Sequence, residues 1–168
     1  AGFLSQDAAH SNIYAYRFRW GTDSRVTDGF YSRYVGAFHG ASKDFLRGIY
    51  KNNYADYSPN AIAASNKPGR VALTELMQKY VGNFLASGNP NGASLADWGT
   101  WNNASGAQKI MIFDADSEKS TSGMSSEYYD EMGTFSQMRA SLTKSEYNIL
   151  VKSLFADRFF MPTVVPEY

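Results

Sequence analysis

Histidine is the residue type best suited to acid–base chemistry near neutral pH, and this 168-residue chain contains two of them. His39 lies in the run Gly36-Ala37-Phe38-His39-Gly40, where glycines on both sides allow backbone conformations that other residues rarely adopt. This setting suits an imidazole that a loop presents to a cleft, although a loop histidine is also compatible with a structural role. His10 lies among small polar residues ahead of the first predicted strand, and we expect an ordinary surface residue there.

No nucleophile accompanies these histidines in the sequence. A serine hydrolase of the α/β type needs the motif G-x-S-x-G on a strained strand-to-helix turn. The nearest string, Gly92-Ala93-Ser94-Leu95-Ala96, lacks the final glycine and follows a helix-ending loop instead of a strand. Asp114 and Asp116 follow a predicted strand, but no second acidic pair at helical spacing faces them. The sequence therefore predicts neither a serine elbow nor a pair of catalytic carboxylates.

The composition of the chain argues against several other classes of function. There is no cysteine, which excludes disulfides, thiol nucleophiles and Cys-ligated metals and leaves the compartment open. With the two histidines placed so differently, and with no Gly-rich phosphate loop after a strand, we expect neither a metal nor a cofactor. Because 16 basic residues balance 16 acidic ones, charge gives no case for nucleic acid or an anionic membrane. No apolar run approaches the roughly 20 residues that span a bilayer.

The elements that must position His39 begin with a strand. Residues 13–20 alternate between aromatic and other side chains, a period of two that predicts a strand. Residues 25–57 have no sustained period and contain four glycines, which predicts a long structured loop with short helical pieces. Long loops in compact domains are more often functional than idle, and this loop carries His39.

The second half of the chain carries clearer helical patterns. Apolar residues recur every three or four positions over residues 71–86, which predicts an amphipathic helix ending at Gly88 in a left-handed cap. Residues 110–113 predict a short buried strand, in one sheet with the first, and residues 117–126 a polar, exposed segment. A capping box, Thr143-x-x-Glu146, announces a last helix whose apolar face is Tyr147, Leu150, Val151, Leu154 and Phe155.

Several of these stretches, in their order, resemble the C-terminal part of type-B carboxylesterases and cholinesterase-like α/β-hydrolases. Together they cover residues 10–115, and the Asn-Phe-x-x-x-Gly-Asn-Pro-Asn-Gly block is the most specific of them. A tryptophan-bearing loop follows that block. The stretches are Ile13-Tyr14-Ala15-Tyr16-Arg17-Phe18, Gly36-Ala37-Phe38-His39-Gly40, Asp44-Phe45-Leu46-Arg47-Gly48, Tyr80-Val81-Gly82-Asn83-Phe84-Leu85-Ala86-Ser87-Gly88-Asn89-Pro90-Asn91-Gly92 and Ile110-Met111-Ile112-Phe113-Asp114.

The resemblance implies an α/β fold: residues 1–168 would be the C-terminal segment of a single α/β-hydrolase catalytic domain, incomplete without an N-terminal chain. It implies hydrolysis of small carboxylic esters by a Ser–His–acid triad, with His39 as the general base. In α/β-hydrolases the triad follows the chain order nucleophile, acid, histidine, so a C-terminal piece holds the histidine alone. An N-terminal polypeptide of the same esterase would carry the serine, the acid and the oxyanion hole. By position, Tyr31, Phe38 and Ala41 would flank the acyl or alcohol pocket.

The chain departs from the family pattern behind the histidine. Family members often carry a carboxylate three residues after it, where this chain has Ser42, and Lys43 and Arg47 stand where apolar residues are common. Two alternatives stay open. A non-enzymatic cholinesterase-like interaction module would not need His39, which is retained. An aromatic-rich ligand- or carbohydrate-binding domain would fit the 15% aromatic content, but open apolar strand edges argue against a domain that folds alone.

Overall fold

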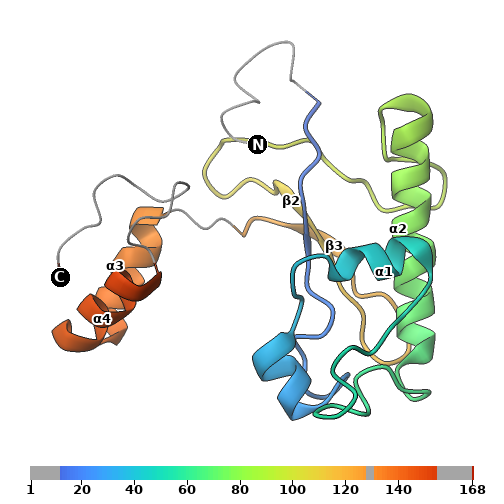
Figure 1. The fold of residues 1–168 in the computed structure, drawn as a ribbon. Coiled ribbons are helices and arrows are strands. Elements are labelled where there is room, and N and C mark those ends of the chain that lie inside the picture. Colours follow the sequence, from blue (N-terminus) through green and yellow to red (C-terminus); the bar gives the residue numbers. More distant parts are fainter. Residues whose placement is uncertain (1–11, 128–130, 155–167) are drawn as a thin grey trace. The chain divides into compact units, whose positions relative to one another are not determined.

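The computed structural model describes residues 12–127, 131–154 and 168. The chain forms two compact units, residues 1–127 and 128–168, and each is described by itself (Figure 1). The described residues form helices and a small three-stranded sheet, in keeping with the predicted α/β class. Two of the residues singled out above, His10 and Phe155, lie outside the described residues.

The sheet of the first unit has the strand order β1-β2-β3 (Figure 1). β1 (Tyr16–Phe18) and β2 (Ile110–Phe113) are parallel, with Arg17 opposite Ile112. The prediction that residues 13–18 and 110–113 contribute strands to one sheet is confirmed, although the first strand begins only at Tyr16. Ahead of it the Met111 N–H still donates to the Ala15 carbonyl at 2.9 Å.

The third strand corrects a prediction. Residues 117–126 are not simply a polar, exposed segment, because β3 (Gly123–Ser125) pairs antiparallel with β2 and its residues are half-buried. The polar residues before it close the hairpin. The hydroxyls of Ser120 and Ser122 donate to the Asp114 carbonyl at 3.2 and 3.1 Å, so polar side chains here satisfy main-chain groups at the end of β2.

The connection from β1 to the long helix has the predicted character of a structured loop with short helical pieces. These are the π-helix η3 (Tyr31–Val35) and α1 (Ala41–Arg47). The predicted helix over residues 71–86 is confirmed as α2 (Lys67–Ser87), with a proline in its first turn. Its C-terminal cap is the predicted one: Gly88 has φ 73° and its N–H donates to the Phe84 carbonyl at 2.7 Å.

α2 buries only part of its apolar stripe. Leu73, Met77 and Tyr80 are buried, whereas Phe84 is 44% exposed and Leu85 is 80% exposed. Four-fifths exposure is unusual for a leucine on the apolar side of a helix. The C-terminal end of α2 therefore extends beyond what the first unit covers.

Aromatic side chains fill the core between α2 and the sheet. The Trp98 ring meets Tyr80 and Phe113 edge to face, with centroids 5.4 and 5.3 Å apart. In the same core, the rings of Trp20 and Phe45 (α1) pack with their centroids 5.0 Å apart. Most of the aromatic content thus serves packing. The buried Asn66 side chain links the loop to α2. It donates to the Val26 and Ala61 carbonyls and accepts from Arg70 Nε.

The second unit contains α3 (Glu131–Ser141) and α4 (Lys144–Leu154). The predicted capping box is confirmed, since the Glu146 carboxylate accepts from the Thr143 N–H at 2.9 Å and from its hydroxyl at 2.7 Å. α3 was not predicted. Phe135 of α3 and Tyr147 of α4 are buried. In the described part of the chain, no helix combines the length and apolar character needed to cross a bilayer.

Candidate functional site

The loop that carries His39 lies between η3 and α1, and two glycines shape it. Gly36 has φ 54° and Gly40 has φ 83°, both in the region that side chains with a Cβ atom avoid. The expectation that glycines on both sides of the histidine take such conformations is confirmed. Gly40 also forms the N-terminal cap of α1.

Close packing ties the start of this loop to the carboxyl end of β1. Gly21 comes three residues after β1 and has φ 98°. A Cβ atom there would lie 2.9 Å from Cε1 of Tyr31 and 3.1 Å from the carbonyl oxygen of Gly36. The sheet end, η3 and the histidine loop therefore meet at a point that only glycine fits.

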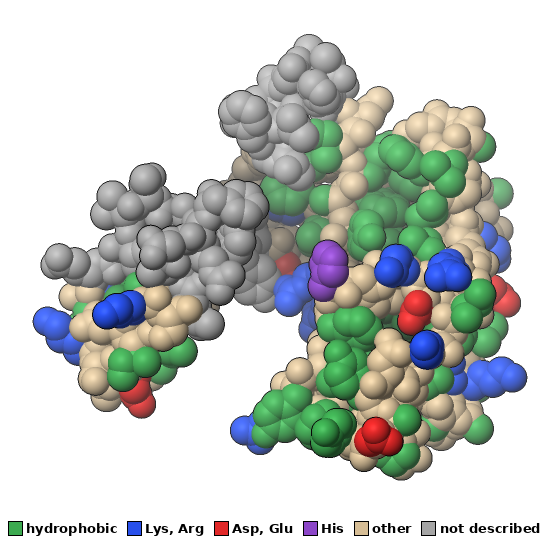
Figure 2. Space-filling model, viewed as in Figure 1, with side chains coloured by type: hydrophobic (Ala, Val, Ile, Leu, Met, Phe, Trp, Pro, Cys, Tyr) green, Lys and Arg blue, Asp and Glu red, His purple; other side chains and the backbone are tan. Residues whose placement is uncertain are grey.

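The His39 imidazole is exposed at the surface, where it is the purple side chain of Figure 2. It forms no hydrogen bond or ion pair with any described residue. His39 also lines none of the three cavities described below. Within the described residues, then, the imidazole has neither the carboxylate nor the hydroxyl that a triad requires.

The three predicted pocket residues do lie together. Tyr31, Phe38 and Ala41 line a small, partly open space of about 10 Å³ beside the histidine loop, along with Trp20, Asp44, Phe45, Tyr50, Lys51 and Ile62. This volume is the size of one water molecule and holds no acyl group in this conformation. Burial, together with Tyr54 and Asp44, raises the pKa of Tyr31 to about 12, so its hydroxyl stays protonated at neutral pH.

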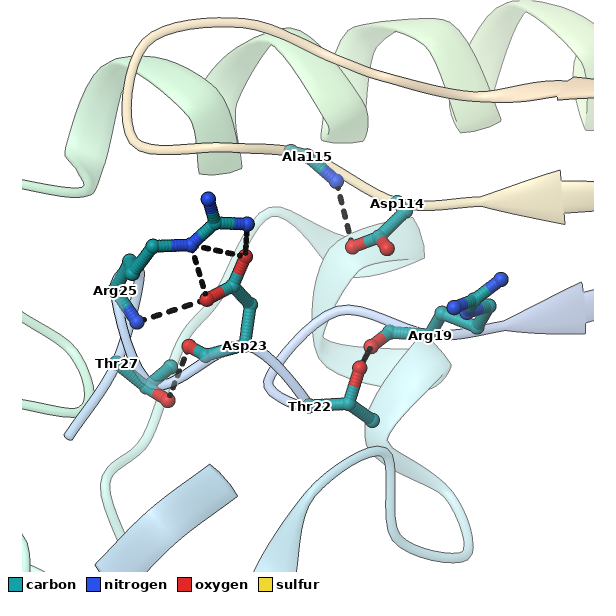
Figure 3. A network of polar contacts seen from close by, with 7 residues as sticks. All are labelled: Arg19, Thr22, Asp23, Arg25, Thr27, Asp114 and Ala115. Atoms are coloured by element: carbon teal, nitrogen blue, oxygen red, sulfur yellow. Dashed lines mark hydrogen bonds and ion pairs between the residues drawn. The ribbon is translucent and has the colours of Figure 1, made fainter. Parts of the chain in front are cut away.

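A larger polar cleft of about 570 Å³ lies at the carboxyl ends of β1 and β2 (Figure 3). Asp114 and Asp116 reach it from β2, and Asp23 and Arg25 reach it from the turn after β1. The sequence analysis considered Asp114 and Asp116 but did not predict catalytic carboxylates there, and it did not single out Asp23 or Arg25. The sequence signal that could have found Asp23 and Arg25 was their position just after a predicted strand, because the carboxyl ends of parallel strands meet at one edge of a sheet.

The carboxylates of this cleft have different environments. The ion pair with Arg25, at 2.6 Å, lowers the pKa of Asp23. Main-chain N–H groups of Glu118 and Lys119, both at 2.8 Å, lower the pKa of Asp116. Burial instead raises the pKa of Asp114, whose main compensation is the Ala115 N–H at 2.9 Å. The carboxylates of Asp23 and Asp116 are thus already bound by other groups of the protein. No group of three or more metal-ligating side chains occurs in the described residues.

A third pocket, of about 160 Å³, lies between the segment leading into β1 and the C-terminal half of α2. Figure 2 shows hydrophobic side chains gathered there. The Tyr14 ring meets Phe84 and Trp98 edge to face, each with centroids 6.0 Å apart. The lining residues are Tyr14, Tyr16, Tyr80, Val81, Phe84, Pro90 and Trp98.

Comparison with known proteins leaves the family open. No protein-family model matches the chain, and no curated protein matches it by sequence. The resemblance to type-B carboxylesterases therefore stays a prediction from the motifs.

Proposed function

We propose that this chain supplies the histidine base of a carboxylic ester hydrolase and that a further polypeptide segment supplies the serine, the acid and the oxyanion hole. The observation that carries the proposal is the His39 imidazole. It is exposed, it has no partner among the described residues, and it lies on a glycine-flanked loop whose Gly36 carbonyl packs against Gly21, just past β1. An imidazole presented in this way is free to meet groups that lie on another segment.

In this proposal His39 moves one proton in each half-reaction. It takes the proton of the serine hydroxyl as the oxygen attacks the ester carbonyl, and it returns that proton to the leaving alcohol. Water then attacks the acyl-enzyme, gives its proton to the same imidazole, and the serine recovers a proton as the acid leaves. The acid residue of the other segment orients the ring, and N–H donors stabilise the oxyanion.

The outer edge of β1 offers main-chain groups with which that segment would pair. In the parallel pair with β2, main-chain bonds to β2 come from Ala15 and Arg19, so the main-chain groups of Tyr16 and Phe18 point to the opposite side. β1 is one of the two outer strands of the described sheet. An edge strand of this kind accepts another strand. The exposed apolar end of α2, with Phe84 and Leu85, is a second surface that further polypeptide would cover.

Substitution of His39 tests the proposal in the complete esterase. We expect His39→Ala to lower kcat on a short-chain chromogenic ester by about four to six orders of magnitude, because the residual rate comes only from binding and the oxyanion hole. A thermal melt should be unchanged, since the side chain is exposed and makes no hydrogen bond with a described residue. His10→Ala is the matched control and should keep full activity.

A serine-directed phosphonylating probe tests which of the two segments carries the nucleophilic serine. We expect no adduct on any serine of this chain and a stoichiometric adduct on the other segment, lost in His39→Ala. Peptide mass spectrometry gives the readout. Full turnover in a folded His39→Ala variant, or an adduct on Ser94 or Ser42, would show that the histidine assignment or the division of the triad is wrong.

A second candidate function is ligand binding by the aromatic pocket. Its volume of about 160 Å³ has room for a single ring, and Trp98 in its wall would report occupancy by fluorescence. We expect titration with phenol or a short glucan to quench Trp98 if this function is correct. In the esterase proposal the same surface is covered by polypeptide, so a wild-type assembly would not respond.

A further inference from the structure

One triplet of the sequence has the form that directs the attachment of a sugar to asparagine. Asn103-Ala104-Ser105 fits the pattern Asn-x-Ser/Thr with a residue other than proline in the middle. No other asparagine of the chain is followed two residues later by serine or threonine. Because an attached oligosaccharide is bulky and hydrated, such a triplet can carry one only where the folded chain leaves the asparagine at the surface.

The triplet lies in the loop between α2 and β2, and the structure exposes it. All residues from Asn102 to Gly106 are exposed. The Asn102 side chain accepts from the Ala104 N–H at 2.8 Å, and the Ala104 carbonyl accepts from the Ala107 N–H at 3.2 Å, so two successive turns form this segment. Nothing lies within 4 Å of a Cβ atom built on Gly106. Asn103 is therefore part of a surface turn.

Both ends of this loop are bonded to the segments of the sheet. The Trp101 N–H donates to the Ile13 carbonyl at 2.7 Å, ahead of β1, and the Lys109 N–H donates to the Ser125 carbonyl of β3 at 2.9 Å. The buried Lys109 side chain donates to the Ala104 carbonyl at 3.1 Å. The fold thus holds the triplet on a short loop with a fixed base.

The contact that the Asn103 side chain makes with Trp101 is compatible with modification. Asn103 Oδ1 accepts from the Trp101 indole N–H at 2.7 Å. Glycosyl transfer forms a bond from Nδ2 to C1 of a sugar and breaks the bond between that carbon and the pyrophosphate of a lipid-linked oligosaccharide. One amide proton and the lipid pyrophosphate leave. The amide keeps Oδ1 and one N–H, so the bond from the indole survives.

We infer that Asn103 is an N-glycosylation site and that the chain passes through a compartment in which lipid-linked oligosaccharide is transferred to asparagine. The glycan lies at the edge of the sheet where β2 begins. Since β1 and β2 are parallel, the polar cleft and the contact of the histidine loop with Gly21 lie at the opposite edge, where these strands end (Figure 1). The sugar therefore leaves them accessible, and any further polypeptide must leave residues 102–106 uncovered.

Peptide mass spectrometry of the protein isolated from its own cells tests the inference, which does not depend on the proposed ester hydrolysis. Digestion with an asparagine-specific glycosidase in ¹⁸O-labelled water releases the sugar and converts the modified asparagine into labelled aspartate. A mock digestion without the glycosidase controls for spontaneous deamidation. We expect glycosidase-dependent label at Asn103. The inference is overturned if the peptide that contains Asn103 is found only in its unmodified form.

Variants of the full chain, fused to a secretion signal and produced in eukaryotic cells, test the triplet itself. Ser105→Ala removes the hydroxyl that the transfer requires but leaves the Asn103 amide and its bond to Trp101, so it should abolish the glycosidase-sensitive mass shift. Ser105→Thr keeps the hydroxyl and should keep the shift. Asn102→Gln is the matched control at the neighbouring asparagine and should also keep it.

The mass shift is read in cell extracts as well as in the medium, so a variant that is not exported is still scored. A shift that persists in Ser105→Ala would overturn the assignment to Asn103, because the sugar would then be attached elsewhere. Absence of the shift from the exported wild-type chain would overturn it as well.

Discussion

At the scale of single residues, Gly21 fixes the place where the histidine loop meets the sheet. If the proposed ester hydrolysis is correct, we expect Gly21→Ala to lower its kcat by about a hundredfold, because the added Cβ pushes against Tyr31 and Gly36 and shifts the loop by a fraction of an ångström to an ångström. The φ of 98° adds strain for any residue with a Cβ. Turnover of a chromogenic ester and a thermal melt are the measurements.

Gly29→Ala is the matched control for that substitution. Gly29 lies ahead of η3 on the same connection, and nothing lies within 4 Å of a Cβ built there. We expect turnover and melting temperature close to wild type. If Gly21→Ala also keeps full turnover in a folded protein, the contact between the sheet end and the loop does not position His39.

The pKa of Asp114 gives a prediction about pH. Burial raises the folded-state pKa above its value in the unfolded chain, so the native state binds more protons between the two. The free energy of unfolding therefore falls as pH rises through this window and stays lower at neutral pH. Asp114→Asn keeps an oxygen for the Ala115 N–H and cannot ionise, so it should be more stable than wild type at pH 7.

Urea denaturation at two pH values measures whether Asp114→Asn raises the free energy of unfolding as predicted. The advantage of Asp114→Asn should vanish near pH 3, below the ordinary carboxyl pKa of about 3.9. Asp23→Asn is the opposite control, because Arg25 lowers the pKa of Asp23 and its loss should destabilise the protein at pH 7. A destabilised Asp114→Asn at pH 7 would contradict the assigned role of burial.

At the scale of elements, α2 begins against the loop that follows β2. The Gly69 N–H donates to the Ser117 carbonyl at 3.0 Å, and a Cβ on Gly69 would lie 1.8 Å from the Asp116 carbonyl oxygen. Alanine stabilises a helix by about 1 kcal/mol relative to glycine. Here, however, the main chain of the loop cannot move aside for the added Cβ atom. We expect Gly69→Ala to cost about 2 kcal/mol net, measured by urea denaturation.

Gly82 lies in the same helix and offers a control. Nothing lies within 4 Å of its Cβ position, so Gly82→Ala should stabilise the protein by up to about 1 kcal/mol. Opposite signs for the two substitutions are the expected result. If Gly69→Ala is also stabilising, the helix and the loop are not in the close contact described above.

These elements also show what local pattern can predict. α2, its Gly88 cap and the Thr143 capping box each follow from residues within a few positions of one another, and each is confirmed. β3 is three residues long and has no alternation, so its strand character comes from pairing with β2 and not from its own sequence. The same holds for Asp23, which shares a cleft with Asp114 only because β1 and β2 are parallel neighbours.

At the scale of the whole molecule, residue type and flanking glycines singled out His39, and the family resemblance singled out Tyr31, Phe38 and Ala41, but neither indicated the size of the space that these three residues line. That size depends on how Trp20, which follows β1, packs against Phe45 and the other lining residues, and no local spacing contains this information. The serine and the acid that the proposed mechanism requires are not among the contacts of His39 within the described residues, and no local motif of this chain predicts them.

The last prediction therefore concerns the outer edge of β1. The main-chain N–H of Tyr16 points away from β2, so Tyr16→Pro removes an outward donor while the bonds from Ala15 and Arg19 to β2 remain. Tyr16→Ala is the control, because it loses the same ring contacts with Trp98 and Phe113 but keeps the N–H. Size-exclusion chromatography of the assembly, with the phosphonylated segment as tracer, measures association. We expect co-elution for wild type and Tyr16→Ala and separation for Tyr16→Pro. Since only main-chain pairing distinguishes the two variants, stoichiometric co-elution of folded Tyr16→Pro would place the contact elsewhere than at β1.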